Sequence, residues 1–103
     1  MKKTTKGRFY FKKTINGNLL GEFSNNGLLE NITESADLIE NTNKSDFEGL
    51  YHSTWFEDVA CSAKLKIEKT GGVYSLIWFE GGNFEGQGML CENSLLIGNY
   101  WSI

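Results

Sequence analysis

The sequence predicts an all-β protein, a single antiparallel meander of about eight strands that closes into a small barrel. Three observations predict this fold. Short runs in which apolar and polar residues alternate recur about every ten residues. Aromatic residues, which favour strands, make up 14% of the chain. Glycine and asparagine fall between the runs, where turns belong. An open, strongly curved sheet or a sandwich is the alternative architecture.

The length and charge of the chain limit its class. Its 103 residues suffice for one domain, residues 1–103, in which we expect residues 1–7 to form a flexible basic tail. A net charge of −3 gives no electrostatic support for binding nucleic acid. No apolar run approaches the roughly 20 residues of a membrane helix. The basic start lacks the apolar segment of a signal peptide, so we expect a cytoplasmic protein with neither a nucleic-acid nor a membrane partner.

The first predicted hairpin joins residues 8–15 to residues 19–24. A two-residue turn would pair Phe11 with Glu22. A three-residue loop pairs Phe11 with Phe23 and gives the better apolar face, because directly paired residues share a face. We therefore favour the three-residue loop.

The sequence of residues 28–41 fits more than one secondary structure. Residues 28–33 and 36–41 have the composition of two weak strands. Residues 34–41 are also the only stretch that could form a short helix, with Ser35 as its cap. Both alternatives stay open, and residues 41–46 are expected to form a polar loop.

The second half alternates more clearly. Residues 47–56 form one expected strand and residues 59–69 the next. A two-residue turn at Gly71-Gly72 pairs Leu65 with Trp78 and Ile67 with Leu76.

Two further turns complete the predicted meander. A three-residue loop at residues 81–83 pairs Trp78 with Gly86. A two-residue turn at residues 92–93 then pairs Phe84 with Trp101. In this register one inner face runs through four strands, with Trp78 central and buried.

The two cysteines, Cys61 and Cys91, lack metal-site spacing, and with His52 alone they cannot complete a four-ligand zinc site. Cys61 is expected in mid-sheet and Cys91 beside a turn two strands away. That separation exceeds the reach of a disulfide, so both thiols should be free. We expect no metal and no cofactor.

Three short motifs resemble the calycin group, the lipocalin and avidin-type barrels. Gly7-Arg8-Phe9 stands where those proteins begin their first strand with a G-x-W element. Gly49-Leu50-Tyr51, followed by Trp55, resembles a G-x-Y strand start. Residues 98–101, Gly-Asn-Tyr-Trp, resemble the closing strand. The resemblance implies a barrel with a small apolar ligand in its interior, and it assigns no binding residue.

Large apolar side chains on the expected inner face are the candidate wall of a ligand pocket, or simply a packed core. These candidates are Phe9, Phe11, Phe23, Tyr74, Leu76, Trp78, Phe84 and Trp101.

A second apolar stripe is expected on the outer face, where a water-facing strand should be polar. Its members are Val73, Ile77, Phe79, Met89, Leu96 and Tyr100. Either the early segment 28–39 covers this stripe or a second subunit does, which makes a homodimer possible.

Catalytic chemistry has little support in the sequence, and no catalytic residue is assigned. His52 titrates near neutrality, but its orientation depends on the next turn. A two-residue turn at residues 57–58 turns His52 inward, whereas a three-residue loop turns Tyr51, Ser53 and Trp55 inward. Nothing selects a working pair among the strand-end carboxylates. These carboxylates are Glu22, Glu57, Asp58, Glu80 and Glu85.

The sequence therefore favours a non-catalytic barrel that binds a small apolar molecule. The second hypothesis is an interaction or structural module with a packed interior that dimerises through the outer stripe. An enzyme comes third.

Overall fold

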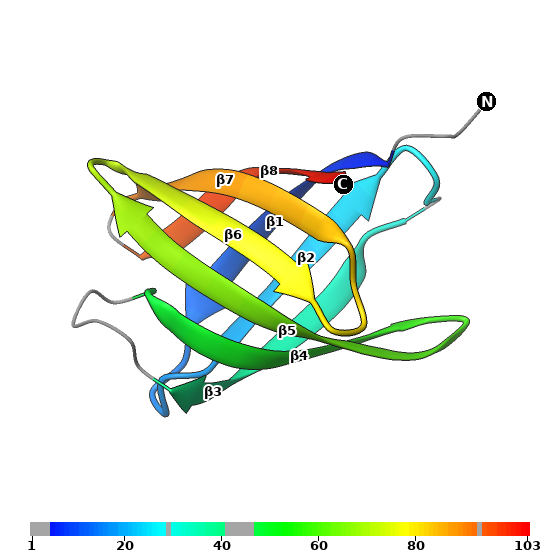
Figure 1. Ribbon diagram of the computed structural model, residues 1–103, viewed down its shortest axis with the longest axis horizontal. Coiled ribbons are helices and arrows are strands. Elements are labelled where there is room, and N and C mark those ends of the chain that lie inside the picture. Colours follow the sequence, from blue (N-terminus) through cyan, green and yellow to red (C-terminus); the bar gives the residue numbers. More distant parts are fainter. Residues whose placement is uncertain (1–4, 29, 41–46, 93) are drawn as a thin grey trace.

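The computed structural model describes residues 5–28, 30–40, 47–92 and 94–103. Eight antiparallel strands follow one another in chain order around a closed barrel (Figure 1), which confirms the predicted all-β meander. The strands are β1 (Lys6–Lys13), β2 (Leu19–Asn25), β3 (Ile32–Glu40), β4 (Gly49–Glu57), β5 (Val59–Thr70), β6 (Val73–Phe79), β7 (Phe84–Cys91) and β8 (Leu95–Ser102). Within these described ranges, no helix has the length and apolarity needed to cross a membrane.

Pairing between the first and last strands closes the barrel. The β1–β8 ladder runs from Lys6 opposite Trp101 to Lys12 opposite Leu95. Beyond it, the Ser102 amide donates to the Thr5 carbonyl oxygen at 2.9 Å, and β1 and β8 lie side by side (Figure 1). Closure removes the free sheet edges that invite aggregation. Because β1 begins at Lys6, the expected basic tail of residues 1–7 overlaps the sheet by two residues, and residues 1–4 lie outside the described ranges.

Strands β5 and β6 have the predicted register. Leu65 pairs with Trp78 and Ile67 with Leu76, as the Gly71-Gly72 turn requires. Between β4 and β5, the turn at Asp58 (φ 65°) resolves the open alternative: Tyr51, Ser53 and Trp55 are on the inner side.

Two hairpins differ from the prediction by two residues. Phe11 pairs with Gly21, not Phe23, and Trp78 pairs with Phe84, not Gly86. In the first hairpin the Thr14 amide donates to the Asn18 carbonyl oxygen at 2.7 Å and so closes a loop of residues 15–17. A shift of two residues leaves every side chain on its predicted face, because the side-chain period of a strand is two.

The last hairpin differs by one residue, which exchanges the faces of β8. Cys91 pairs with Leu95 around a three-residue turn in which Glu92 has φ 55°. Leu96 and Tyr100 consequently point inward and are buried, whereas Trp101 lies on the outer side. The predicted inward position of Trp101 and the predicted outward positions of Leu96 and Tyr100 were therefore wrong.

The uncertain segment after β2 forms one strand, β3, and neither two strands nor a helix. It is paired along both sides, to β2 and to β4, with a register shift between Leu38 and Glu40. Its cross-strand hydrogen bonds therefore hold it in the sheet although its sequence alternates poorly. The polar loop expected at residues 41–46 lies outside the described residues.

The barrel interior is tightly filled at the end where β1 finishes and β2 begins. Large buried side chains fill it: Phe11, Leu19, Phe47, Tyr51, Leu65, Ile67 and Leu96. The Tyr51 hydroxyl donates to the Phe47 carbonyl oxygen at 3.0 Å, so the polar tip of this buried ring is satisfied. This half of the barrel is a well-packed core that stabilises the closed sheet.

Close strand contact depends on Gly21. A Cβ atom at this position would collide with the backbone carbonyl of Tyr10 on β1, which has no freedom to move aside. We expect Gly21→Ala to lower the free energy of unfolding by on the order of 3 kcal/mol, at the upper end of the cost of overpacking. Chemical denaturation monitored by circular dichroism measures this loss.

The matched control is Gly72→Ala in the β5–β6 turn, where nothing lies within 4 Å of an added Cβ. Equal stabilities of the two variants would show that the β1–β2 contact is not as close as described.

Candidate functional site

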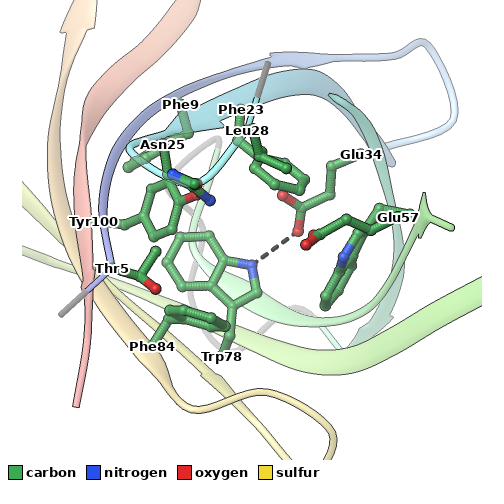
Figure 2. A pocket seen from close by; sticks show the side chains of 12 residues that line it. Thr5, Phe9, Phe23, Asn25, Leu28, Glu34, Glu57, Trp78, Phe84 and Tyr100 are labelled. Atoms are coloured by element: carbon green, nitrogen blue, oxygen red, sulfur yellow. Dashed lines mark hydrogen bonds between the residues drawn. The ribbon is translucent and has the colours of Figure 1, made fainter. Parts of the chain in front are cut away.

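A cavity of about 200 Å³, partly open to solvent, occupies the opposite end of the barrel, beside Thr5 and Tyr100. The residues that line it come from seven strands, from the residue before β1 and from the β2–β3 connection (Figure 2). They are Thr5, Phe9, Phe23, Asn25, Gly27, Leu28, Glu34, Trp55, Glu57, Trp78, Phe84 and Tyr100.

Strand alternation brings these side chains together. In β1 and β2, Phe9 pairs directly with Phe23, so both rings point to the same interior face. In β3 and β4, Glu34 pairs directly with Trp55 in the same way. Trp78 comes from β6 on the far side of the barrel, so the cavity lies between two walls of the closed sheet.

Glu34 is the unusual residue of the site, because it is a carboxylate with only 3% of its surface exposed. The Trp78 indole donates a hydrogen bond from Nε1 to Glu34 Oε2 at 2.8 Å (Figure 2). The Ser53 hydroxyl donates to the same oxygen. Within the described residues both bonds go to Oε2, so Oε1 is the atom available to a ligand or to water.

Burial raises the pKa of Glu34 from 4.5 to about 7, because the charged form loses its hydration. The hydrogen bonds from Ser53 and Trp78 act in the opposite direction by stabilising the carboxylate. Near neutral pH the side chain can therefore hold a proton or give it up. Oε1 can donate a hydrogen bond in the first state and accept one, or bind a cation, in the second.

Two polar side chains shape another side of the cavity. Asn25 donates from Nδ2 to the Tyr100 hydroxyl at 2.7 Å, and its Oδ1 accepts the Gly27 amide at 2.8 Å. These bonds hold the turn after β2 against the Tyr100 ring. Burial raises the pKa of Tyr100, so its hydroxyl is neutral at physiological pH.

Aromatic rings form most of the wall. Tyr100 contacts Trp78, Phe84 and Phe23, with ring centroids 5.8, 5.7 and 6.0 Å apart. Phe9 meets Trp78 edge to face at 5.8 Å. Rings held in such edge and tilted contacts are fixed in orientation, so the wall is largely formed before any ligand arrives.

The predicted pocket residues divide into three groups. Phe9, Phe23, Trp78 and Phe84 line the cavity. Phe11, Tyr74 and Leu76 are buried in the core and do not line it. Trp101 is on the outer side, where its Nε1 donates to Glu85 Oε1 at 2.9 Å.

The predicted outer stripe is also corrected. Val73, Ile77 and Met89 are exposed apolar residues, and Phe79 is half-buried. Leu96 and Tyr100 belong to the interior.

Glu57 is the exception among the other candidate groups, most of which lie away from the cavity. His52 is exposed on the outer face of β4. Of the strand-end carboxylates, Glu57 lines the cavity, on the same side as Glu34 in Figure 2. Cys61 and Cys91 are free thiols, as predicted. Within the described residues, no group of three or more His, Cys, Asp or Glu side chains could hold a metal ion.

Sequence reasoning missed Glu34, Trp55 and Tyr100. Tyr100 was lost through the one-residue register error, and Trp55 through the unresolved turn that follows β4. A signal for Glu34 existed: a strand that places Ala36 inward also places Glu34 inward, and a carboxylate at an inner barrel position is unusual.

No family model, curated protein or solved structure matches the chain.

We expect Glu34→Gln to change how stability depends on pH. Since the folded-state pKa of about 7 exceeds the ordinary value of 4.5, the folded state retains a proton that the unfolded state releases. The free energy of unfolding contributed by Glu34 is therefore full below about pH 4.5 and falls until about pH 7, by on the order of 3 kcal/mol in total. The variant lacks this loss, so its stability relative to the wild type should increase between those values.

Urea denaturation at about pH 5 and about pH 8 measures this difference. Glu68→Gln is the control, because it removes the same charge from an exposed position on β5. A stability difference between Glu34→Gln and wild type that stays constant with pH would contradict the raised pKa.

Proposed function

We propose that the protein binds a small ligand in the cavity at the open end of its barrel and performs no catalysis. The observation that carries the proposal is a largely aromatic cavity with a buried carboxylate in its wall. Binding sites are typically concave and mainly apolar, with a few placed polar groups that orient the ligand. The resemblance to the calycin group, which implies an interior ligand, supports the same proposal.

The cavity volume limits the size of the ligand. An apolar cavity of about 150 Å³ is enough to hold benzene, whereas drug-sized ligands occupy about 300 Å³ or more. A cavity of about 200 Å³ thus suits a single ring or a short branched chain. A steroid or a long fatty acid is larger than this cavity.

We also propose a cytoplasmic location, which the two free thiols favour because a reducing compartment preserves them.

Binding of a single-ring probe tests the proposal. Ligand-detected NMR should show saturable one-to-one binding of tert-butylbenzene to the wild-type protein. Thr5→Trp should weaken this binding roughly tenfold or more, because Thr5 lines the cavity and the larger side chain takes up its volume.

Thr70→Trp, at the exposed end of β5, is the matched control and should bind like the wild type. Binding that is equally strong in both variants places the probe elsewhere, and a wild-type protein that binds neither this probe nor a charged probe of the same size refutes the function.

A second candidate, a homodimer through the outer face, is favoured by one observation. Met89 pairs with Ile97 and Ile97 pairs with Tyr10, so three exposed apolar side chains form one row across β7, β8 and β1. Such a row is unusual on a water-facing surface. A twofold axis near this row would bury it against the same row of a second copy.

Sedimentation analysis distinguishes this candidate. If the row is an interface, the double variant Met89→Lys, Ile97→Lys should convert a dimer into a monomer, because two charges would be buried without partners. Ile15→Lys is the control, since Ile15 is fully exposed in the β1–β2 loop. A monomeric wild-type protein at high concentration rejects the homodimer.

A further inference from the structure

The charged side chains that the structure describes in the cavity wall are both acidic. Glu34 and Glu57 line the cavity, and no Lys, Arg or His is among the described lining residues. An anionic ligand would therefore meet carboxylates and no compensating cation. Lys64 and Lys66 form ion pairs with Glu80 and Glu68, neither of which lines the cavity.

The aromatic rings that form the rest of the cavity wall are suited to binding an organic cation. Aromatic ring faces attract ammonium groups, and this attraction strengthens when the cation is desolvated. Trp78, the ring type that binds cations best, lies at the centre of the view in Figure 2, with Tyr100, Phe84, Phe9 and Phe23 around it. Carboxylates and rings thus border the same volume.

The carboxylate of Glu34 is held in place before a ligand arrives. Ser53 and Trp78 both bond to Oε2, which fixes the side chain and leaves Oε1 for the ligand. The Trp78 indole N–H is committed to Glu34, so the ring cannot turn away without breaking this bond. Pre-organised groups of this kind lower the entropic cost of binding.

We propose that the natural ligand is a small organic cation, an ammonium group on a single ring or short apolar body, bound between the aromatic rings and the carboxylate of Glu34. This inference rests on the proposed function, because it names the ligand class for the same cavity. Glu57, which is exposed at the mouth, adds a second negative charge along the entry path.

The binding of such a cation depends on pH through Glu34. Among the described lining residues, the titratable groups that share the cavity with Glu34 are Tyr100 of β8 and Glu57 of β4. The other strands around it present Phe9, Phe23, Phe84 and Trp78, none of which titrates. A permanent cation favours ionised Glu34, so its affinity should rise by up to about tenfold between about pH 6 and about pH 8.

Three probes of one size separate the charge classes: phenyltrimethylammonium, its neutral carbon isostere tert-butylbenzene, and the anion benzenesulfonate. The quaternary ammonium does not titrate, so any pH dependence comes from the protein. Ligand-detected NMR gives the three dissociation constants. We expect the cation to bind roughly tenfold or more tightly than the neutral isostere, and the anion to bind weakest.

Glu34→Gln should reduce the affinity for the cation roughly tenfold and abolish its pH dependence, with little change for tert-butylbenzene. Glu68→Gln, which removes an exposed charge on β5, should change none of the three constants. Unchanged binding of tert-butylbenzene also shows that Glu34→Gln is folded.

Each outcome decides a different claim. A neutral isostere that binds as tightly as the cation overturns the cation inference and leaves the proposed function standing. Tighter binding of benzenesulfonate overturns it as well. If none of the three probes binds to the wild-type protein, the proposed function fails together with the inference.

Discussion

The bonds from Ser53 and Trp78 to one oxygen of Glu34 join β4 and β6 to β3 through the barrel interior. Strands β3 and β6 are not neighbours in the sheet, so this link crosses the space that the cavity occupies. It also imposes a cost, because a buried carboxylate loses hydration that two donors only partly replace. An apolar side chain at this position would avoid that cost but would leave the Ser53 and Trp78 donors without their acceptor. Desolvation of the carboxylate thus lowers stability at the end that holds the cavity, a pattern typical of binding sites.

The sequence predicted the parts of the fold in which local chemistry determines register. Strands β5 and β6 alternate cleanly around Gly71-Gly72, and their pairing was correct. Errors of two residues at Phe11 and Trp78 were harmless, because they preserve the faces. The error of one residue after Cys91 was not harmless. There Glu92 adopts a left-handed backbone conformation, which is uncommon for glutamate and could not be expected from the sequence. The resulting error exchanged the two faces of β8, so Tyr100 was not predicted to lie in the site.

Glu34 could not be found by the pattern that found the other residues. Periodicity identifies an inner face by its apolar residues, so a strand whose inner positions include a carboxylate loses the signal there. Ala36 is small and Leu38 only half-buried, which left β3 with little to mark it as a strand. Its pairing on both sides decides its conformation, and such long-range contacts override local preference. Glu34 thus weakens the sequence signal for β3 and is also the residue that distinguishes the cavity from an ordinary packed core.

The open end and the packed end of the barrel depend on each other. At the packed end, buried rings and aliphatic side chains around Phe47 and Tyr51 fill the interior and stabilise the closed sheet. That stability allows the other end to hold a cavity and a desolvated acid without losing the fold. The acid in turn opposes filling of the cavity. A larger apolar side chain beside Glu34 would shut water away from Oε1 and raise the cost of its charge further. The carboxylate therefore favours a partly open cavity, and a ligand that brings a positive charge is the occupant that removes this cost.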